Sequence, residues 1–504
     1  MAGAEAPSIQ EMCERTRSAL HAAQDADVIA GCGRAALALL PRDPETCMQL
    51  AHQQLNSVPF KHVKTCWRRL YTDAALYQVV EMAEEWSTGK RQKMEEQKGV
   101  ERRSEEEEGE GEWITKISKM LDMALILTGA PEREELVERW FAALRGVVEK
   151  PPQDEERPTK KRKIDTTPSA QFLETFPANI SPSPILRNPI PRKANLSLAA
   201  FQSKMSDPAS QTPMIIEGAI DHWPALDGER AWKRPSYLLQ RTLGGRRLVP
   251  VEIGRSYTDD TWGQKILTFG EFMKVYMLTE DLPPPSPLPS SDSPNGIQPA
   301  GLPSPTPPKA SPASQKGYLA QHDLFAQIPS LRSDISIPDY CYTEPAAQPT
   351  NPSHVLPVAR LADPLLHAWF GPGGTISPLH TDPYHNIFAQ VVGHKYVRLY
   401  APHETGRMYP RGVDESGIDM SNTSAVDLDE AMATWAEISC WEEGGRDALG
   451  DAGAGDYDEG FPGFRRARYV EGVLGPGECL YIPVGWWHYV RSLTPSFSVS
   501  FWWN

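Results

Sequence analysis

Hydrophobic residues recur at helical spacing along the first part of the chain. Within residues 35–40 and again within residues 70–82, apolar side chains return every three or four positions, which is typical of helices buried along one side. Asp43 and Pro44 separate the two runs. The period resumes from residue 113 to residue 148, where Pro131 and Glu132 are expected to start a new helix. Residues 1–150 are therefore predicted to form an α-helical domain.

A charged stretch interrupts this pattern at about residues 90–112, which read KRQKMEEQKGVERRSEEEEGEGE. It has almost no apolar residues with which to join a core. We expect a solvated, acidic insertion, either an extension or a loop. Residues 151–171 follow as a linker that contains the basic run Lys160-Lys161-Arg162-Lys163.

The pattern changes to short strands from about residue 172. Segments rich in Val, Ile and aromatic residues alternate with turn residues, which is typical of an antiparallel sandwich or barrel. These segments are PMIIEGAI, RRLVPVEIG, AQVVGHKYVRLYAP, GECLYIPVGW and SFSVSFWW. Residues 281–316 are rich in proline and residues 443–460 in glycine and acidic residues, so both are expected to be disordered surface insertions. The predicted fold class is α+β, with a helical domain before a β-rich domain at residues 172–504.

Composition narrows the class of protein. The 504 residues are 40% hydrophobic and 23% charged, which suits a soluble chain of at least two folded units. A net charge of −15 argues against a nucleic-acid binder that ignores sequence. The seven cysteines form no CxxC pair and indicate reduced thiols, and we see neither a signal peptide nor an apolar run long enough for a membrane helix. We therefore expect an intracellular protein, and the basic run favours nuclear import over an ordinary linker.

One set of residues suggests a metal site. His380 and Asp382 are two positions apart, so on a strand both side chains would leave the same face. His488 follows the turn Gly475-Pro476-Gly477 and the apolar strand after it. Two imidazoles and one carboxylate form the facial triad that binds non-haem Fe(II) and leaves coordination positions open.

Each of these residues also has an ordinary structural interpretation. His380 could lie on the surface after a turn, Asp382 before Pro383 could cap that turn, and His488 could be a core histidine. His385, His394 and His403 are close in sequence but form no second triad, and we interpret them as ordinary polar residues.

Lys395 lies in a predicted strand pair, on the face that carries Val397 and Leu399. An inward lysine is costly unless an anion meets it. Ser377, three residues before His380, could share that anion, such as a dicarboxylate that binds the metal with its other end. The alternative is a lysine that extends to solvent along an outer face.

These motifs resemble a known family. GTISPLHTDPYHN, HKYVRLYAP, PGECLYIPVGWWHYVRS and FSVSFWWN are similar to the JmjC-domain 2-oxoglutarate oxygenases, and most of all to the small group described as histone lysine demethylase eight and as protein arginyl hydroxylase. Further upstream, PMIIEGAIDHWPAL, VPVEIGRSYTDDTWGQKILT and GYLAQHDLFAQIPSLRSDISIPDYC extend the resemblance over roughly residues 205–504. It implies a double-stranded β-helix, a cupin-like jelly roll.

The resemblance also implies a set of ligands. Iron would bind His380, Asp382 and His488, and 2-oxoglutarate would bind Lys395, Ser377, Asn386 and Tyr318. Oxidative decarboxylation of 2-oxoglutarate by O₂ would give succinate, carbon dioxide and an oxidant that attacks an unreactive C–H bond. Hydroxylation of an N-methyl group would release formaldehyde, so that the net outcome would be demethylation.

The substrate contacts in this group would correspond to Glu252, Trp262, Trp369 and Trp502. A carboxylate among aromatic rings suits a guanidinium, but aromatic rings also bind methylammonium, and each tryptophan could instead be core. Our first hypothesis is a hydroxylase of a protein arginine, the second a histone N-methyl-lysine demethylase, and the third a catalytically silent scaffold. The expected partner is a protein or a histone tail, with no membrane and no sequence-specific nucleic acid. The expected location is the nucleus, with the cytoplasm as a second location. The sequence does not give the oligomeric state.

Overall fold

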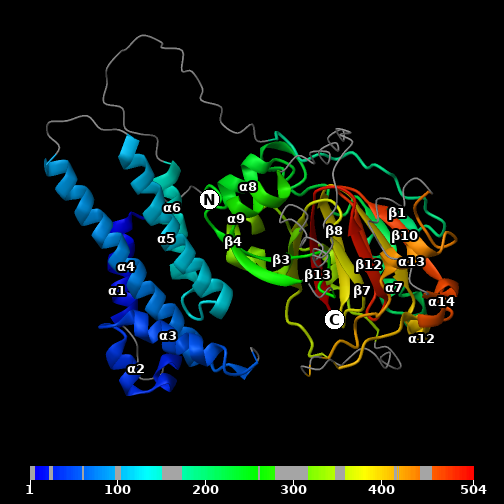
Figure 1. The fold of residues 1–504 in the computed structure, drawn as a ribbon, viewed down its shortest axis with the longest axis horizontal. Helices are drawn as coiled ribbons and strands as arrows, with labels where there is room; N and C mark the ends of the chain where they lie inside the picture. The colour runs from blue at the N-terminus through cyan, green and yellow to red at the C-terminus, as the bar shows by residue number, and fades with distance from the viewer. Residues whose placement is uncertain are drawn as a thin grey trace, which may run out of the picture. The chain divides into compact units, whose positions relative to one another are not determined.

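The computed structural model describes most of the chain (Figure 1). The described residues are 6–21, 27–59, 62–96, 104–149, 173–258, 262–278, 316–346, 358–413, 417, 419–442 and 457–504. The basic run, most of the proline-rich segment and residues 443–456 lie outside these ranges. Within them, no helix is both long and apolar enough to cross a membrane.

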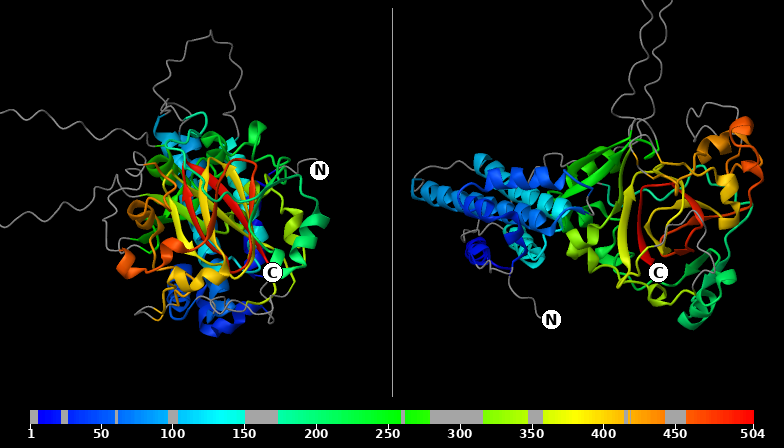
Figure 2. Two further views of the ribbon diagram at one scale, coloured as in Figure 1. Left: turned by 90° about the vertical axis from the view of Figure 1, so that its right-hand side faces the viewer. Right: turned by 90° about the horizontal axis from the view of Figure 1, so that it is seen from below.

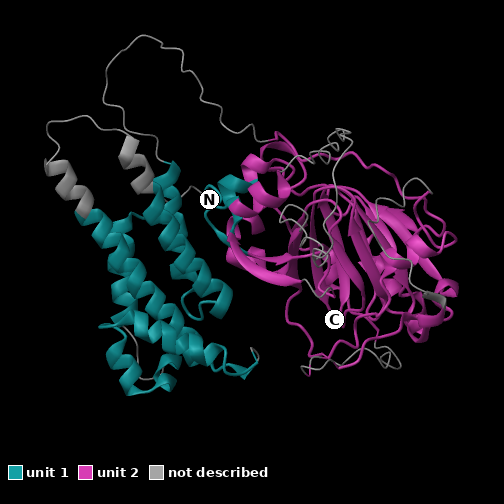
Figure 3. Ribbon diagram, in the orientation of Figure 1, with its two compact units in different colours: residues 1–171, 238–249, 268–270 teal, residues 172–237, 250–267, 271–504 magenta. Residues whose placement is uncertain are grey.

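The chain divides into two compact units (Figure 3). The first contains residues 1–171 together with Leu238–Val249 and Thr268–Gly270, and the second contains the rest. The division thus falls inside helix α8 (Pro235–Arg241) and strand β3 (Leu248–Ile253), so two segments from the β-rich part of the sequence belong to the helical unit.

The first unit is helical, as predicted. Its helices are α1 (Ile9–His21), η1 (Val28–Cys32), α2 (Arg34–Leu39), α3 (Pro44–Leu55), α4 (Thr65–Glu96), α5 (Ser104–Thr128) and α6 (Glu134–Glu149). Asp43 caps α3 by accepting a hydrogen bond from the Thr46 amide at 3.0 Å, with Pro44 in the first turn. The start of α6 lies after Pro131 and Glu132, because Glu132 has a left-handed φ of 59° that a helix does not allow.

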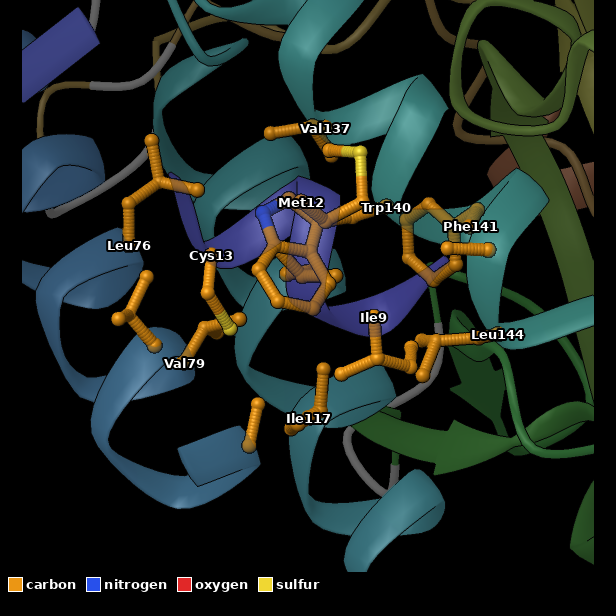
Figure 4. Packing of buried hydrophobic residues seen from close by; sticks show 14 of the residues in the cluster. Ile9, Met12, Cys13, Leu76, Val79, Ile117, Val137, Trp140, Phe141 and Leu144 are labelled. Atoms are coloured by element: carbon orange, nitrogen blue, oxygen red, sulfur yellow. The ribbon is translucent and has the colours of Figure 1, made fainter. Parts of the chain in front are cut away.

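The core of this unit joins α1, α4, α5 and α6. Figure 4 shows Met12, Cys13 and Trp140 meeting within the cluster, and Met12 and Trp140 have no exposed surface. The indole of Trp140 donates a hydrogen bond to the buried Thr16 hydroxyl at 2.9 Å, so the helices pack without a buried unpaired polar group at this point.

The predicted loop at residues 90–112 differs from the structure. Helix α4 continues to Glu96 and α5 begins at Ser104, so much of the stretch is helical. Glu, Lys, Gln and Arg are good helix formers, and they extend helices that the apolar residues on either side already fix. Our prediction relied on the missing apolar residues and gave too little weight to helix propensity.

The expected disorder at residue 316 and at residues 457–460 is also wrong. Lys316 donates a hydrogen bond to the Gly373 carbonyl at 2.9 Å, and α14 (Tyr457–Gly460) is helical.

The second unit is built on two sheets that lie against each other, as the views in Figures 1 and 2 show. The nine-stranded sheet has the order β1-β2-β11-β8-β13-β6-β5-β3-β4, and the four-stranded sheet has the order β10-β9-β12-β7. The strands are β1 (Arg192–Ala194), β2 (Met214–Glu217), β3, β4 (Gly263–Thr268), β5 (Gly317–His322), β6 (Leu365–Gly371), β7 (Ile376–His380), β8 (His385–Val392), β9 (Lys395–Tyr400), β10 (Tyr469–Leu474), β11 (Cys479–Ile482), β12 (Trp487–Ser492) and β13 (Ser496–Trp503). This is the jelly-roll arrangement expected from the resemblance.

Two apolar layers cover the four-stranded sheet. Val397, Leu399 and Val490 pack inward against Phe388 and Leu480 of the larger sheet. On its outer face, Tyr396, Trp487 and other side chains pack under α12 (Thr405–Met408) and α13 (Leu428–Thr434). Because alternate residues of one strand face opposite sides, β9 is buried along its whole length. The two units also contain short helices, which are α7 (Leu198–Met205), η3 (Pro208–Ser210), η4 (Gly228–Arg230), α9 (Phe269–Phe272), η5 (Met273–Met277), α10 (Leu324–Gln327), α11 (Pro329–Arg332), η7 (Asp339–Tyr342), η8 (Pro402–Glu404) and η10 (Phe464–Arg466).

Candidate metal centre and its cavity

Three ligand groups from separate parts of the chain meet at one point. His380 ends β7, His488 lies opposite it on β12, and Asp382 follows just after β7. The ligand atoms of these residues lie within 4.8 Å of one another, and they form the one such group among the described residues. Asp382 is therefore placed by the turn after the strand, and not on the strand itself as we had expected.

Both imidazoles are oriented by the backbone. His380 Nδ1 lies 2.7 Å from the Pro378 carbonyl oxygen, and His488 Nδ1 lies 3.0 Å from that of Trp486. A carbonyl can only accept, so each Nδ1 carries the proton and each Nε2 presents a lone pair. The Nε2 atoms lie 3.9 Å and 3.5 Å from Asp382 oxygens, on the side where an ion would bind.

The charge states of the cluster suit a cation. Burial and the neighbouring His488 lower the pKa of His380 to about 4, so its imidazole is neutral. Burial alone would raise the pKa of Asp382, but the nearby imidazoles of His488 and His380 outweigh it and lower that pKa. Two imidazoles and one carboxylate are the donor set of a non-haem Fe(II) site, so these residues fit that metal.

A small cavity of about 20 Å³ opens beside the three ligands. It is lined by Tyr318, Trp369, Ser377, His380, Asp382, Asn386, Phe388, Ile482, His488 and Val490. The Oδ1 atom of Asn386 is buried and has no hydrogen-bond partner among the described residues, so a ligand in the cavity would find an unused acceptor there.

Lys395 is fully buried near this cavity. Its ammonium donates a hydrogen bond to the Tyr318 hydroxyl at 3.1 Å and lies 5.1 Å from the centre of the Phe388 ring. Burial lowers its pKa to about 7. No carboxylate among the described residues pairs with it, so the structure presents a buried cation that an anionic ligand would complete. The alternative of a lysine reaching solvent does not hold.

The four residues expected at the substrate surround the same region. Glu252 on β3 lies opposite Tyr318 on β5, and burial raises its pKa although the Trp262 indole partly offsets this. Trp369 lines the cavity and donates its indole N–H to Ser500 at 2.9 Å. Trp502 lies opposite Asn386 in the sheet and is 7% exposed.

Our sequence interpretation missed Tyr257. Its side chain is half-buried, its hydroxyl lies 3.4 Å from the Thr423 hydroxyl, and burial raises its pKa to about 12, with the charges of Asp382 and Glu252 adding to the shift. The residue follows Glu252 by five positions in a loop, where no periodicity indicates which way a side chain points. It could have been found only as a neighbour of Glu252.

The other histidines stay outside the cluster. His385 is buried and its Nδ1 lies 3.0 Å from the Tyr481 hydroxyl, while the His403 side chain is 74% exposed. His394 begins the turn into β9 and is half-buried.

Comparison with known proteins agrees with this arrangement. The sequence profile of the family described as "Cupin-like domain" matches residues 208–504. The chain is 36% identical over 399 residues to "Lysine-specific demethylase 8" of Danio rerio, which covers 78% of this chain and 75% of that protein. It is 36% identical over 353 residues to the protein of the same name from Xenopus tropicalis, covering 69% of this chain and 61% of that protein. It is 35% identical over 315 residues to "Lysine-specific demethylase JMJ30" of Arabidopsis thaliana, covering 62% of this chain and 54% of that protein. The chain therefore spans less than two thirds of the frog and plant proteins.

Proposed function

The chain belongs to the JmjC group of cupin-like oxygenases, and from this membership we propose that it is an Fe(II)- and 2-oxoglutarate-dependent dioxygenase that hydroxylates a protein side chain, with arginine as the first candidate. His380, Asp382 and His488 would hold the iron. Bound iron supplies, with 2-oxoglutarate and O₂, an oxidant strong enough to break a C–H bond. The chain's own residues bind and orient the two substrates and exclude water.

The residues proposed for 2-oxoglutarate are Lys395, Tyr318, Ser377 and Asn386. The Lys395 ammonium would form an ion pair with the carboxylate that is remote from the metal, beside the Tyr318 hydroxyl that it already contacts. Ser377 and Asn386 line the cavity and offer a hydroxyl and an amide to the same ligand. A dianion would supply the partner that the buried Lys395 ammonium lacks, which supports this assignment.

Glu252 is the single observation that carries the arginine proposal. Its carboxylate is half-buried next to the cavity residue Tyr318, and no cationic side chain among the described residues forms an ion pair with it. A guanidinium can donate two parallel hydrogen bonds to such a carboxylate and stack on Trp262 or Trp369, whereas a trimethylammonium can donate none. A half-buried acid without a cationic partner among the described residues therefore favours a substrate cation that donates hydrogen bonds.

Lysine demethylation is the second candidate, and the printed names of the relatives favour it. The same cavity would then place an N-methyl group at the metal, and the hydroxymethyl product would release formaldehyde. Aromatic rings at Trp369 and Trp502 are compatible with a methylammonium as well. A silent scaffold is disfavoured because the three metal ligands line one cavity and Lys395 contacts Tyr318, which lines the same cavity.

Mass spectrometry separates these candidates. Arginine-containing and methyl-lysine-containing peptides, or histone tails, would be incubated with the purified protein, Fe(II), 2-oxoglutarate and O₂. Hydroxylation adds one oxygen to an unmethylated peptide, and demethylation removes one CH₂ per methyl group with formaldehyde. Formaldehyde release without any hydroxylated arginine would overturn the arginine proposal. Absence of succinate in every reaction would favour the scaffold.

We also propose a nuclear location, which rests on the run Lys160-Lys161-Arg162-Lys163 in the linker. Replacement of these four residues by alanine in a fluorescently labelled full chain should shift the protein toward the cytoplasm. An unchanged distribution would remove the support for this proposal.

A further inference from the structure

Next to the metal cavity, three rings form a continuous wall. Trp502 on β13 stacks on Tyr384, with ring centres 5.6 Å apart, and meets the edge of the His367 ring at 4.6 Å. His367 lies on β6 two residues before Trp369, so both side chains leave the same face of the sheet. Because Trp369 lines the metal cavity, His367 and Trp502 lie on the same side of the sheet as the metal.

Two polar atoms in this wall lack a hydrogen-bond partner in the part of the chain that the structure describes. The Nε1 atom of Trp502 and the Nδ1 atom of His367 are both buried, and neither has a hydrogen-bond partner among the described residues. A buried polar group without a hydrogen-bond partner destabilises the protein. A ligand that supplies the missing partners would remove that destabilisation, so these atoms indicate what kind of group binds here.

The chemistry of these atoms excludes the target cation as their partner. An indole N–H only donates, and guanidinium and methylammonium groups only donate as well, so neither cation can pair with Trp502. A carbonyl oxygen can. Burial lowers the pKa of His367, although the charges of Asp323 and Asp382 partly offset this, so its imidazole is neutral and offers one donor and one acceptor.

We propose that His367, together with the indole N–H of Trp502, binds a main-chain peptide group next to the target side chain. A peptide group carries both an acceptor oxygen and a donor N–H, which matches this pair of rings. The site would then recognise an arginine only within a polypeptide, and His367 would determine that specificity. This inference rests on the proposed function, since it takes the metal cavity to be the place where the target side chain reacts.

Two probes of the arginine side chain test the inference. N-acetyl-L-arginine N-methylamide carries the guanidinium flanked by two peptide groups, whereas n-butylguanidine carries the guanidinium alone. Their affinities would be measured by NMR titration of the full chain loaded with Zn²⁺ and 2-oxoglutarate, which permits binding without turnover. The wild-type protein should bind the blocked arginine about tenfold more tightly, as expected for one or two added hydrogen bonds.

Substitutions at His367 separate hydrogen bonding from packing. His367→Phe keeps a flat ring against Trp502 but removes both nitrogens, so it should lose most of the tenfold preference and leave the affinity for n-butylguanidine unchanged. His367→Gln restores a donor and an acceptor and should recover part of the preference. Equal affinities of the wild-type protein and the His367→Phe variant for the blocked arginine would overturn the inference.

A failure of the proposed function can be distinguished from a failure of this inference by a separate measurement. Succinate formation by the Fe(II)-loaded wild-type protein without any peptide reports on the dioxygenase alone. If succinate forms but neither probe binds, the arginine assignment is wrong and the inference fails with it. If both probes bind but His367 makes no difference, the arginine assignment stands and only the inference is overturned.

Discussion

The orientation of two histidine rings decides whether a metal can bind. His380 and His488 each use Nδ1 to contact a backbone carbonyl two residues earlier, which leaves Nε2 facing Asp382. We predict that His380→Ala abolishes peptide-dependent turnover and weakens Fe(II) binding while the circular dichroism spectrum stays unchanged, because the ligands line an open cavity. His403→Ala changes a histidine that is 74% exposed and should retain full activity. Turnover by His380→Ala would remove this residue from the metal site.

Lys395 is the residue whose loss should affect 2-oxoglutarate and not the metal. A hydrogen bond to a charged group contributes about 1.5–3 kcal/mol, so Lys395→Met should raise the KM for 2-oxoglutarate about 10- to 100-fold. Metal affinity, measured separately by Mn²⁺ binding, should be unchanged. The exposed Lys274 provides the control, since Lys274→Ala removes a lysine of the same unit without touching the cavity. A lower metal affinity with an unaltered KM would contradict the proposed role.

The same lysine predicts a pH dependence. Burial lowers the Lys395 pKa to about 7, so in the ligand-free protein its positive charge is present below this pH and is lost as the pH rises through it. Binding of a dianion requires the charged form, so the affinity for 2-oxoglutarate should fall above about pH 7 and protons should be taken up on binding. Calorimetry in buffers of different ionisation enthalpy measures that uptake. The Lys395→Met variant should show neither effect.

Local sequence patterns predict only some of the residues of this site. The spacing of His380 and Asp382 and the turn before His488 were enough to suggest one metal, because ligand chemistry is restrictive. Tyr257 and His367 have no such spacing. Which side of the sheet His367 faces, and the ring it meets there, depend on the pairing of β6 with β13, and no local pattern encodes that pairing.

At the scale of elements, the tight turn from β8 in the larger sheet to β9 in the smaller one places Lys395. Gly393 has a φ of 68°, and an added Cβ would collide with the Pro495 carbonyl oxygen. Gly393→Ala should therefore lower the free energy of unfolding by roughly 2–4 kcal/mol, from backbone strain and overpacking together. It should also weaken 2-oxoglutarate binding, because Lys395 follows two residues later. Thermal unfolding and titration with 2-oxoglutarate measure the two effects.

Gly406 offers the matched control for this change. It lies in α12, and an added Cβ there would meet no atom within 4 Å. Gly406→Ala should leave the free energy of unfolding within about 0.5 kcal/mol of the wild-type value. Equal stabilities of the two variants would show that the turn from β8 to β9 tolerates a side chain at residue 393.

The strands themselves could be predicted, but their order could not. Short runs rich in Val, Ile and aromatic residues, bounded by turn residues, identified β2, β3, β8, β9, β11 and β13. The neighbours of each strand are mostly distant in sequence, as when β13 lies between β6 and β8. Such pairings depend on the packing of the whole unit. The helical continuation of α4 and α5 into charged sequence was missed because the prediction relied on apolar residues, whereas the helix propensity of Glu, Lys, Gln and Arg favours a helix without them.

At the scale of the whole molecule, the helical unit includes sequence from beyond the linker. Arg247 is the clearest case, because its guanidinium donates to both carboxylate oxygens of Asp122, each 3.0 Å from Nε, and both residues are buried. The Leu248 amide also donates to Asp122 at 2.8 Å, and Leu243 joins the core of α1, α4, α5 and α6. No pattern in the sequence predicts this contact, because the buried ion pair joins two residues 125 positions apart.

This ion pair supplies a prediction for the stability of the helical unit. Asp122→Ala would leave the Arg247 charge buried without a partner, which typically costs about 3–5 kcal/mol, so the first thermal transition should fall by roughly 10 °C. The double variant Asp122→Ala with Arg247→Leu removes both charges and should recover most of the loss, because well-packed apolar residues often replace a buried pair without cost. Scanning calorimetry of the full chain compares the three proteins. The double variant could instead be as unstable as the single one. In that case the loss would come from the hydrogen bond between the Asp122 carboxylate and the Leu248 amide. Arg247 would then contribute little to holding Leu238–Val249 in the helical unit.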